Sequence, residues 1–107
     1  MKAVKVFDSR ESLEKVFEKQ SIRRLRVGDT RFCLAQHNGE YFAFELLCPH
    51  QNHPLDEGHI TDFKELICPL HEYRFALQSG KESGSRCRDL KTYQVEINEE
   101  GVFIYLH

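Results

Sequence analysis

The sequence predicts an all-β domain, a small antiparallel β sandwich or barrel with one short helix near its N-terminus. Two strand-like runs, 31–36 and 41–45, are joined through Asn38-Gly39, and Asn-Gly is the strongest short signal for a hairpin. A second pair of alternating runs, 93–97 and 102–106, flanks another polar turn and predicts a closing hairpin. Between the two hairpins lie two segments that begin with Cys-Pro. Because proline cannot donate to a central ladder, these segments are expected to be loops.

A strand and a helix are expected before the first hairpin. The segment 1–7 alternates apolar and polar residues as a strand does. Asp8 followed by Glu11 has the form of a capping box. Apolar residues at i, i+3 and i+4 from Leu13 then follow the period of a helix, which we expect to end near Lys19.

Length and charge limit the classes of function. With 107 residues the chain is expected to form one domain, 1–107. Its formal net charge of −2 gives no overall basic field for nucleic acid. One basic run comprises Arg23, Arg24, Arg26 and Arg31. We interpret this run as the solvated face of a strand, and the alternative is a docking patch for an acidic partner.

The N-terminal segment is charged throughout and has no apolar stretch of signal-peptide length. No window is apolar over the length that is needed to cross a bilayer. We therefore expect a soluble cytoplasmic protein that does not enter a membrane. In that compartment the four cysteines are expected to bind metal or to remain free thiols rather than to form disulfides.

Two Cys/His motifs carry the chemistry. Cys48 and His50 form C-x-H, and after 17 residues Cys68 and His71 form C-x-x-H. Two thiolates and two imidazoles suit zinc or iron–sulfur chemistry, and they are a legitimate structural zinc set. Cys48 and His50 are separated by a single residue, which would make a tight chelate for one tetrahedral ion. Paired zinc ligands are usually two to four residues apart. The spacing is more comfortable if each loop supplies one ligand to each of two metal atoms, as in a Rieske [2Fe-2S] centre.

The chain resembles Rieske-type ferredoxins, and the resemblance extends beyond these four residues. Pro54-Leu55 and Gly58 match the family's usual run after the first motif, and Phe75 and Gly80 match its run after the second. Residues 90–106 look like the closing hairpin of that fold. The resemblance spans about residues 27–106 and implies a Rieske-like sandwich with a small cluster-binding subdomain, whose loops are expected within 46–77.

The resemblance implies one [2Fe-2S] cluster, with Cys48 and Cys68 on one iron and His50 and His71 on the other. The histidine-bound iron is expected to be the reducible one. Both histidines are expected to ligate through one ring nitrogen and to present the other to solvent, so that electrons leave by this edge and electron uptake depends on pH.

The resemblance also implies a low potential. Respiratory Rieske subunits have a disulfide across the cluster, but His53 and Leu70 occupy the matching positions here. Those proteins also have a serine and a tyrosine that donate hydrogen bonds near the cluster, and here the positions hold Tyr73 and Phe75. Such hydrogen bonds raise the potential. We therefore expect a midpoint in the lower part of the Rieske range of about −150 to +300 mV.

By this resemblance the protein is an electron carrier and not an enzyme. Its expected partners are a flavin-dependent reductase upstream and a terminal oxygenase or other redox enzyme downstream, which dock transiently near His50 and His71. The small subunit of an assimilatory nitrite reductase is an alternative that the chain also resembles. A structural zinc-binding interaction module and a β domain with vestigial ligands are alternatives from different classes.

Two segments depart from the family pattern. Glu72 stands where the family commonly has glycine, and we expect its carboxylate to point to solvent. The loop 83–88 occupies the place of a proline-containing cover loop but has no proline, which puts its rigidity in doubt.

Other residues are given no role in the site. His53 is an alternative ligand that the register disfavours, and it is expected on the rim where a partner docks. Cys33 is interpreted as a core thiol and Cys87 as a reduced bystander, with a Cys33–Cys87 disulfide as the alternative. The aromatic residues expected to be strand residues, in the core or at an edge, are Tyr41, Phe42, Phe44, Tyr73 and Phe75.

Overall fold

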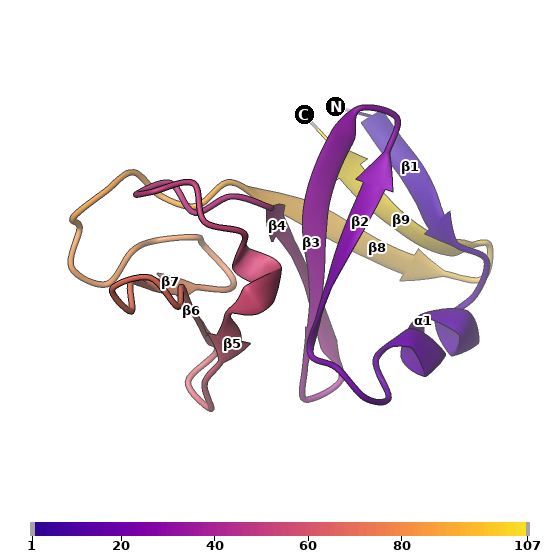
Figure 1. The fold of residues 1–107 in the computed structure, drawn as a ribbon. Helices are drawn as coiled ribbons and strands as arrows, with labels where there is room; N and C mark the ends of the chain where they lie inside the picture. Colours follow the sequence, from indigo (N-terminus) through magenta and orange to yellow (C-terminus); the bar gives the residue numbers. More distant parts are fainter. Residues whose placement is uncertain (1, 107) are drawn as a thin grey trace.

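The computed structural model describes residues 2–106 and consists of two antiparallel sheets and one α-helix (Figure 1). The larger sheet has six strands in the order β1-β9-β8-β4-β3-β2. Its strands are β1 (Lys2–Phe7), β2 (Ile22–Val27), β3 (Thr30–His37), β4 (Glu40–Glu45), β8 (Thr92–Asn98) and β9 (Gly101–Leu106). The predicted all-β class and both predicted hairpins are confirmed. Met1, which the first strand was expected to include, lies outside the described residues.

The second sheet has three short strands in the order β5-β6-β7 and lies on one side of the first (Figure 1). Its strands are β5 (His59–Ile60), β6 (Glu65–Ile67) and β7 (Arg74–Ala76), and a 3₁₀ turn, η1 (Leu55–Glu57), precedes them. These strands have no counterpart among the predicted elements, because two or three residues are too few to show an alternating pattern. They form the base from which the two Cys-Pro loops project, and we call β5–β7 and these loops the cluster lobe.

Strand β3 is buried on both faces and joins the two parts of the molecule. Phe32 and Leu34 point into a core between the curled halves of the large sheet, together with Val102 and Ile104. Cys33 and its neighbours on the other face belong to a second core, which includes the interior of the cluster lobe. Because successive strand residues point to opposite faces, one strand contributes to both cores.

Helix α1 (Arg10–Val16) closes one end of the first core with the buried side chain of Leu13. Its N-cap is Ser9, whose Oγ accepts the Ser12 N–H at 3.2 Å. The prediction that Asp8 caps the helix is therefore wrong by one residue. The helix also ends before Lys19, because the Phe17 N–H bonds to the carbonyl of Glu14 and tightens the last turn. No helix in the described part of the chain is long and apolar enough to span a bilayer.

Gly80 holds the end of the cluster lobe against the segment that leads into β8. Its φ is +80°, its N–H donates to Ala76 at 2.7 Å, and its carbonyl accepts from Leu90 at 2.7 Å. A Cβ at this position would overlap the backbone carbonyl oxygen of Leu90. Only glycine therefore fits both the left-handed conformation and the close approach of the two segments.

We predict that Gly80→Ala destabilises the fold more than Gly28→Ala. Gly28 also has a positive φ, +59°, but a Cβ there meets nothing within 4 Å. The control should therefore show only the conformational cost, about 1 kcal/mol. Gly80→Ala should cost about 1–3 kcal/mol more, because the overlap forces the backbone to move. Urea unfolding of both variants measures the difference, and equal losses would contradict the packing role of Gly80.

Candidate metal centre

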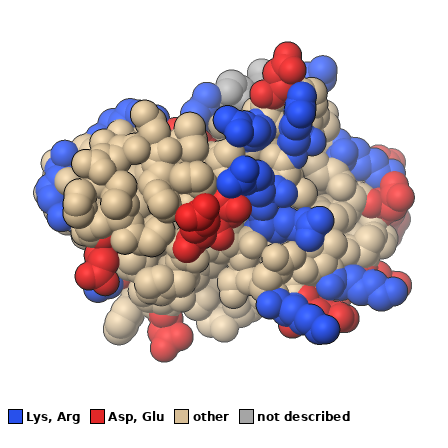
Figure 2. Space-filling view, viewed as in Figure 1, with Lys and Arg blue, Asp and Glu red and all other residues tan. Residues whose placement is uncertain are grey.

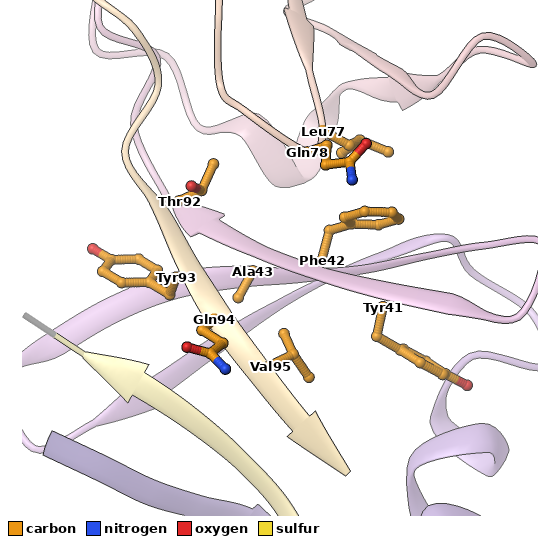
Figure 3. Close-up of a pocket in the computed structure, with 9 residues that line it drawn as sticks. All are labelled: Tyr41, Phe42, Ala43, Leu77, Gln78, Thr92, Tyr93, Gln94 and Val95. Carbon is orange, nitrogen blue, oxygen red and sulfur yellow. The ribbon is translucent and has the colours of Figure 1, made fainter. Parts of the chain in front are cut away.

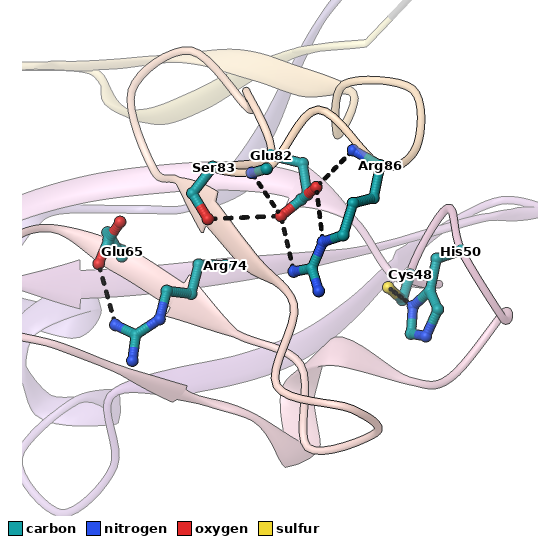
Figure 4. Close-up of polar contacts among 8 residues, drawn as sticks. Cys48, His50, Glu65, Arg74, Glu82, Ser83 and Arg86 are labelled. Atoms are coloured by element: carbon teal, nitrogen blue, oxygen red, sulfur yellow. Dashed lines mark hydrogen bonds and ion pairs between the residues drawn. The ribbon is translucent and has the colours of Figure 1, made fainter.

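The two Cys-Pro loops bring three of the four predicted ligands together in the cluster lobe. One ligand atom from each of Cys48, His50 and Cys68 lies within 4.8 Å of the others. Cys48 and Cys68 are fully buried, and Nδ1 of His50 lies 2.9 Å from Sγ of Cys48. Figure 4 shows the His50 ring beside this sulfur.

The fourth predicted residue, His71, lies beside this group but outside the tight set. Its ring centroid is 5.7 Å from that of His50, with the two planes tilted by 59°. His71 is exposed, whereas His50 is half-buried and its Nε2 is buried without a hydrogen-bond partner. The expectation that both imidazoles present a nitrogen to solvent is therefore wrong for His50, which is packed inside the lobe.

The same backbone hydrogen bond closes both loops. The Cys48 N–H donates to the carbonyl of His53 at 2.8 Å, and the Cys68 N–H donates to the carbonyl of Tyr73 at 2.9 Å. In the second loop His71 and Glu72 both have positive φ, +65° and +53°. Glu72 thus adopts the left-handed conformation that glycine favours, and its side chain is exposed, as expected.

The electrostatics of the Cys68 thiol and the His50 imidazole fit a metal site better than a nucleophile. Burial and, to a lesser extent, the neighbouring Cys48 raise the pKa of Cys68 to about 11, although a hydrogen bond from the Leu70 backbone opposes this rise. Burial, followed by the nearby His71, lowers the pKa of His50. A buried neutral thiol is a poor nucleophile. A bound cation would compensate two buried thiolates and would use neutral imidazole, so the donor set fits a metal.

Tyr73, which was expected to be a strand residue, contacts His50 in the site. Its ring stacks on the His50 imidazole with centroids 3.7 Å apart and planes at 13°. The Arg86 guanidinium carbon lies 3.8 Å from the centroid of the same Tyr73 ring. No local pattern in the sequence indicates this contact, because it joins residues from three separate loops.

The loop 83–88 is held by a buried carboxylate. Glu82 is fully buried and its two oxygens accept hydrogen bonds from the Arg86 side chain, at 3.2 and 2.9 Å, and from the Arg86 backbone at 2.7 Å. The Gly84 N–H at 3.0 Å and the Ser83 hydroxyl at 3.4 Å complete the set (Figure 4). The loop is therefore anchored by hydrogen bonds in place of a proline.

The remaining cysteines and His53 lie outside the group. All four cysteines are free, so the alternative Cys33–Cys87 disulfide is not formed. Burial raises the pKa of Cys33 to about 12, as expected of a core thiol. His53 hydrogen bonds to Glu57 at 3.1 Å rather than joining the Cys/His group.

A groove elsewhere on the molecule carries no comparable chemistry. It has a volume of about 490 Å³ and lies between β4, β8 and the turn after β7 (Figure 3). Its lining is Tyr41, Phe42, Ala43, Leu77, Gln78, Thr92, Tyr93, Gln94 and Val95. None of these lining residues is a cysteine, a histidine or a charged residue, and the Tyr41 hydroxyl points away toward α1 (Figure 3).

Comparison with known proteins places this geometry in a family. The model of the Rieske [2Fe-2S] domain matches residues 5–94. The chain is 40% identical over 55 residues to the ferredoxin component of the alkene monooxygenase system of Xanthobacter autotrophicus, a match over 51% of this chain and 45% of that protein. It is 36% identical over 72 residues to the ferredoxin subunit of 3-phenylpropionate/cinnamic acid dioxygenase from Photorhabdus laumondii, which covers 66% of this chain and 69% of that subunit.

Solved structures show the same fold. A chain in the complex of reduced oxygenase and oxidized ferredoxin of carbazole 1,9a-dioxygenase is 27% identical, with a TM-score of 0.75 over 96% of this chain and 92% of that one. The ferredoxin of carbazole 1,9a-dioxygenase from Nocardioides aromaticivorans IC177 is 19% identical, and its fold agrees over the full length of both chains with a TM-score of 0.81.

We predict that Glu82→Gln lowers stability at neutral pH and that this loss shrinks in acid. Hydrogen bonds from Arg86 hold the pKa of Glu82 at about 2, against a usual 4.5, despite its burial. A depressed pKa contributes stability above the usual value, and this contribution is lost as pH falls from about 4.5 toward 2. Urea unfolding of both proteins at pH 7 and pH 3 measures the gap.

The matched control is Glu65→Gln, which removes the more exposed Glu65–Arg74 ion pair of the same lobe. This change should cost less than about 1 kcal/mol. If Glu82→Gln lowered the free energy of unfolding equally at both pH values, the inference that the buried Glu82 carboxylate is ionised at neutral pH would be wrong.

Proposed function

The chain belongs to the Rieske [2Fe-2S] domain family, and from this premise we propose that it is a one-electron carrier that supplies a terminal oxygenase. The single observation that supports this most is the convergence of Cys48, His50 and Cys68, beside His71, in a lobe with two buried thiols. The relatives and a solved complex that it resembles are ferredoxin components of oxygenase systems. A [2Fe-2S] cluster in this lobe would take up and give back one electron at a time.

Cys48 and Cys68 would hold one iron and His50 and His71 the other. The thiols fit the inner position because both are fully buried, and the exposure of His71 suits the outer position. Apolar side chains of the protein exclude water from the position of the two cysteines. Leu55, Leu66 and Phe75 are fully buried and pack in the same core as the two cysteines.

Partners would dock at the end of the cluster lobe, beside His71. On the face seen in Figure 2 the middle of this lobe carries few charged side chains, and basic and acidic groups lie at its margin. The arginines of β2 gather over the large sheet instead, where Arg24 pairs with Asp56 at 3.0 Å and Arg26 with Asp29 at 3.8 Å. Those pairs support the solvated-face interpretation of the basic run. A small docking face suits the weak interfaces of electron transfer.

The proposal includes a flavin-dependent reductase as the upstream donor and the cytoplasm as the location. The oxygenase ferredoxins among the relatives favour this role over that of a nitrite reductase small subunit. A structural zinc module remains the rival from another class, because two thiols and two imidazoles can also hold zinc.

We predict that the dithionite-reduced protein gives the electron paramagnetic resonance spectrum of a histidine-ligated [2Fe-2S] centre, with an average g-value below that of the free electron. The oxidised protein should be red-brown. Cys68→Ser should lose this signal, whereas Cys87→Ser should keep it, because Cys87 lies outside the Cys/His group. A colourless sample with one zinc per chain, after iron-replete anaerobic expression, would exclude electron transfer and favour the zinc module.

We predict a midpoint potential in the lower part of the Rieske range of about −150 to +300 mV. Phe75 is fully buried and has no hydroxyl to donate toward the ligands. The Tyr73 ring stacks on His50, and no hydrogen bond of its hydroxyl is found in the described structure. A reduced cluster that lacks such donors is less stabilised. Spectroelectrochemical titration measures the midpoint, and a value near the upper limit would contradict this reasoning.

A further inference from the structure

A column of four side chains connects the loop 83–88 to the candidate ligand His50. His50 comes from the first Cys-Pro loop, Tyr73 follows the second, and Glu82 and Arg86 come from the third. The contacts are a His50–Tyr73 stack at 3.7 Å, an Arg86–Tyr73 contact at 3.8 Å and a two-point Glu82–Arg86 ion pair. Figure 4 shows the Arg86 guanidinium beside Glu82, with Cys48 and His50 on the other side of the Arg86 side chain.

The distances place Tyr73 between the other two groups. The nearly parallel His50 ring, at 3.7 Å, fills one face of Tyr73. The Arg86 Cζ lies 3.8 Å from the centroid of the Tyr73 ring, and at the ring edge this distance would make it overlap ring atoms. The face that His50 covers is already occupied. The Arg86 guanidinium therefore covers the opposite face, a favourable cation–π arrangement.

Arg86 is fixed although its side chain is 47% exposed. Glu82 binds it through two side-chain nitrogens and the backbone N–H. A bidentate arginine–carboxylate pair restrains the plane of the guanidinium as well as its position. A buried carboxylate strongly requires such partners, so the pair orders the loop and directs Arg86 onto Tyr73.

The column acts on the orientation of the His50 ring. Stacking against Tyr73 fixes the plane of the imidazole, and the contact of Nδ1 with the Cys48 sulfur at 2.9 Å fixes its rotation within that plane. Without Tyr73 the half-buried ring would gain freedom to tilt. Groups that orient a ligand side chain tune both the retention and the electronic properties of the metal.

We propose that Tyr73 and Arg86 are positioning residues for His50, with buried Glu82 as the anchor that holds Arg86 in place. The inference rests on the proposed function, since it requires His50 to be an iron ligand. The loop 83–88 contains no residue of either Cys/His motif. It would nevertheless determine how firmly, and in which orientation, His50 of the first Cys-Pro loop holds its iron.

The experiment compares the holoprotein with its Tyr73→Leu and Tyr73→Phe variants. One readout is the rate at which the visible absorption bleaches in excess chelator, and the other is the set of g-values of the reduced protein. Tyr73→Leu removes the stacking ring, so cluster loss should accelerate by about 10-fold or more and the g-values should shift. Tyr73→Phe keeps the ring and should restore both properties toward the wild type.

Two further variants separate positioning from general stability. Arg86→Gln removes the guanidinium from the Tyr73 face and should change the same two readouts in the same direction but less strongly; it also serves if Tyr73→Leu fails to fold. Arg74→Gln removes another arginine of the lobe, paired with Glu65 at 3.3 Å, and should leave the g-values unchanged.

The outcomes distinguish the two levels of inference. If the wild-type protein lacks the Rieske spectrum, the proposed function fails. If the wild type shows it but Tyr73→Leu and Arg86→Gln keep its g-values, the positioning role is overturned, even where the free energy of unfolding falls. Shifted g-values in Tyr73→Leu and Arg86→Gln, with recovery in Tyr73→Phe, would support the proposal that Tyr73 and Arg86 position His50.

Discussion

The burial of β3 on both faces is the constraint on which the rest of the molecule depends. Leu34 packs into the core of the large sheet, while Cys33 on the opposite face contributes to the core of the cluster lobe. Its partner strand β4 repeats the arrangement, since Ala43 and Phe44 lie in different cores. A register slip of one residue would exchange the two faces. The lobe that carries Cys48 and Cys68 is therefore fixed to the sheet by two adjacent strands.

What the sequence predicted well was local. Asn38-Gly39 specifies a hairpin from its own conformational preference, and Asn38 and Gly39 both have positive φ in the structure. The spacing of the Cys/His motifs singled out four residues, of which Cys48, His50 and Cys68 lie together in the structure, whereas the assignment of all four as ligands stays a prediction. The helix cap was missed by one residue, since Asp8 and Ser9 are both good N-caps and only the local backbone decides between them.

What the sequence could not predict depends on contacts between distant segments. Tyr73 has the composition of a strand residue, and only the meeting of three loops places it between His50 and Arg86. Glu82 looked like any polar loop residue, yet it is fully buried and accepts hydrogen bonds from three residues of the loop that follows. Such a network compensates the cost of burying its charge only when every donor is in place.

In the proposed centre the two histidines would have different tasks. His50 is packed beneath Tyr73 with Nε2 buried, so its surroundings restrain the ring. His71 itself adopts a left-handed backbone conformation and is exposed, and so is the next residue, Glu72. If both are ligands, as proposed, restraint at one imidazole and exposure of the other would let the lobe hold its metal rigidly and offer a short path to a partner. In the proposed function electrons would cross at exposed His71, and the packing around His50 would set the properties of the centre from within.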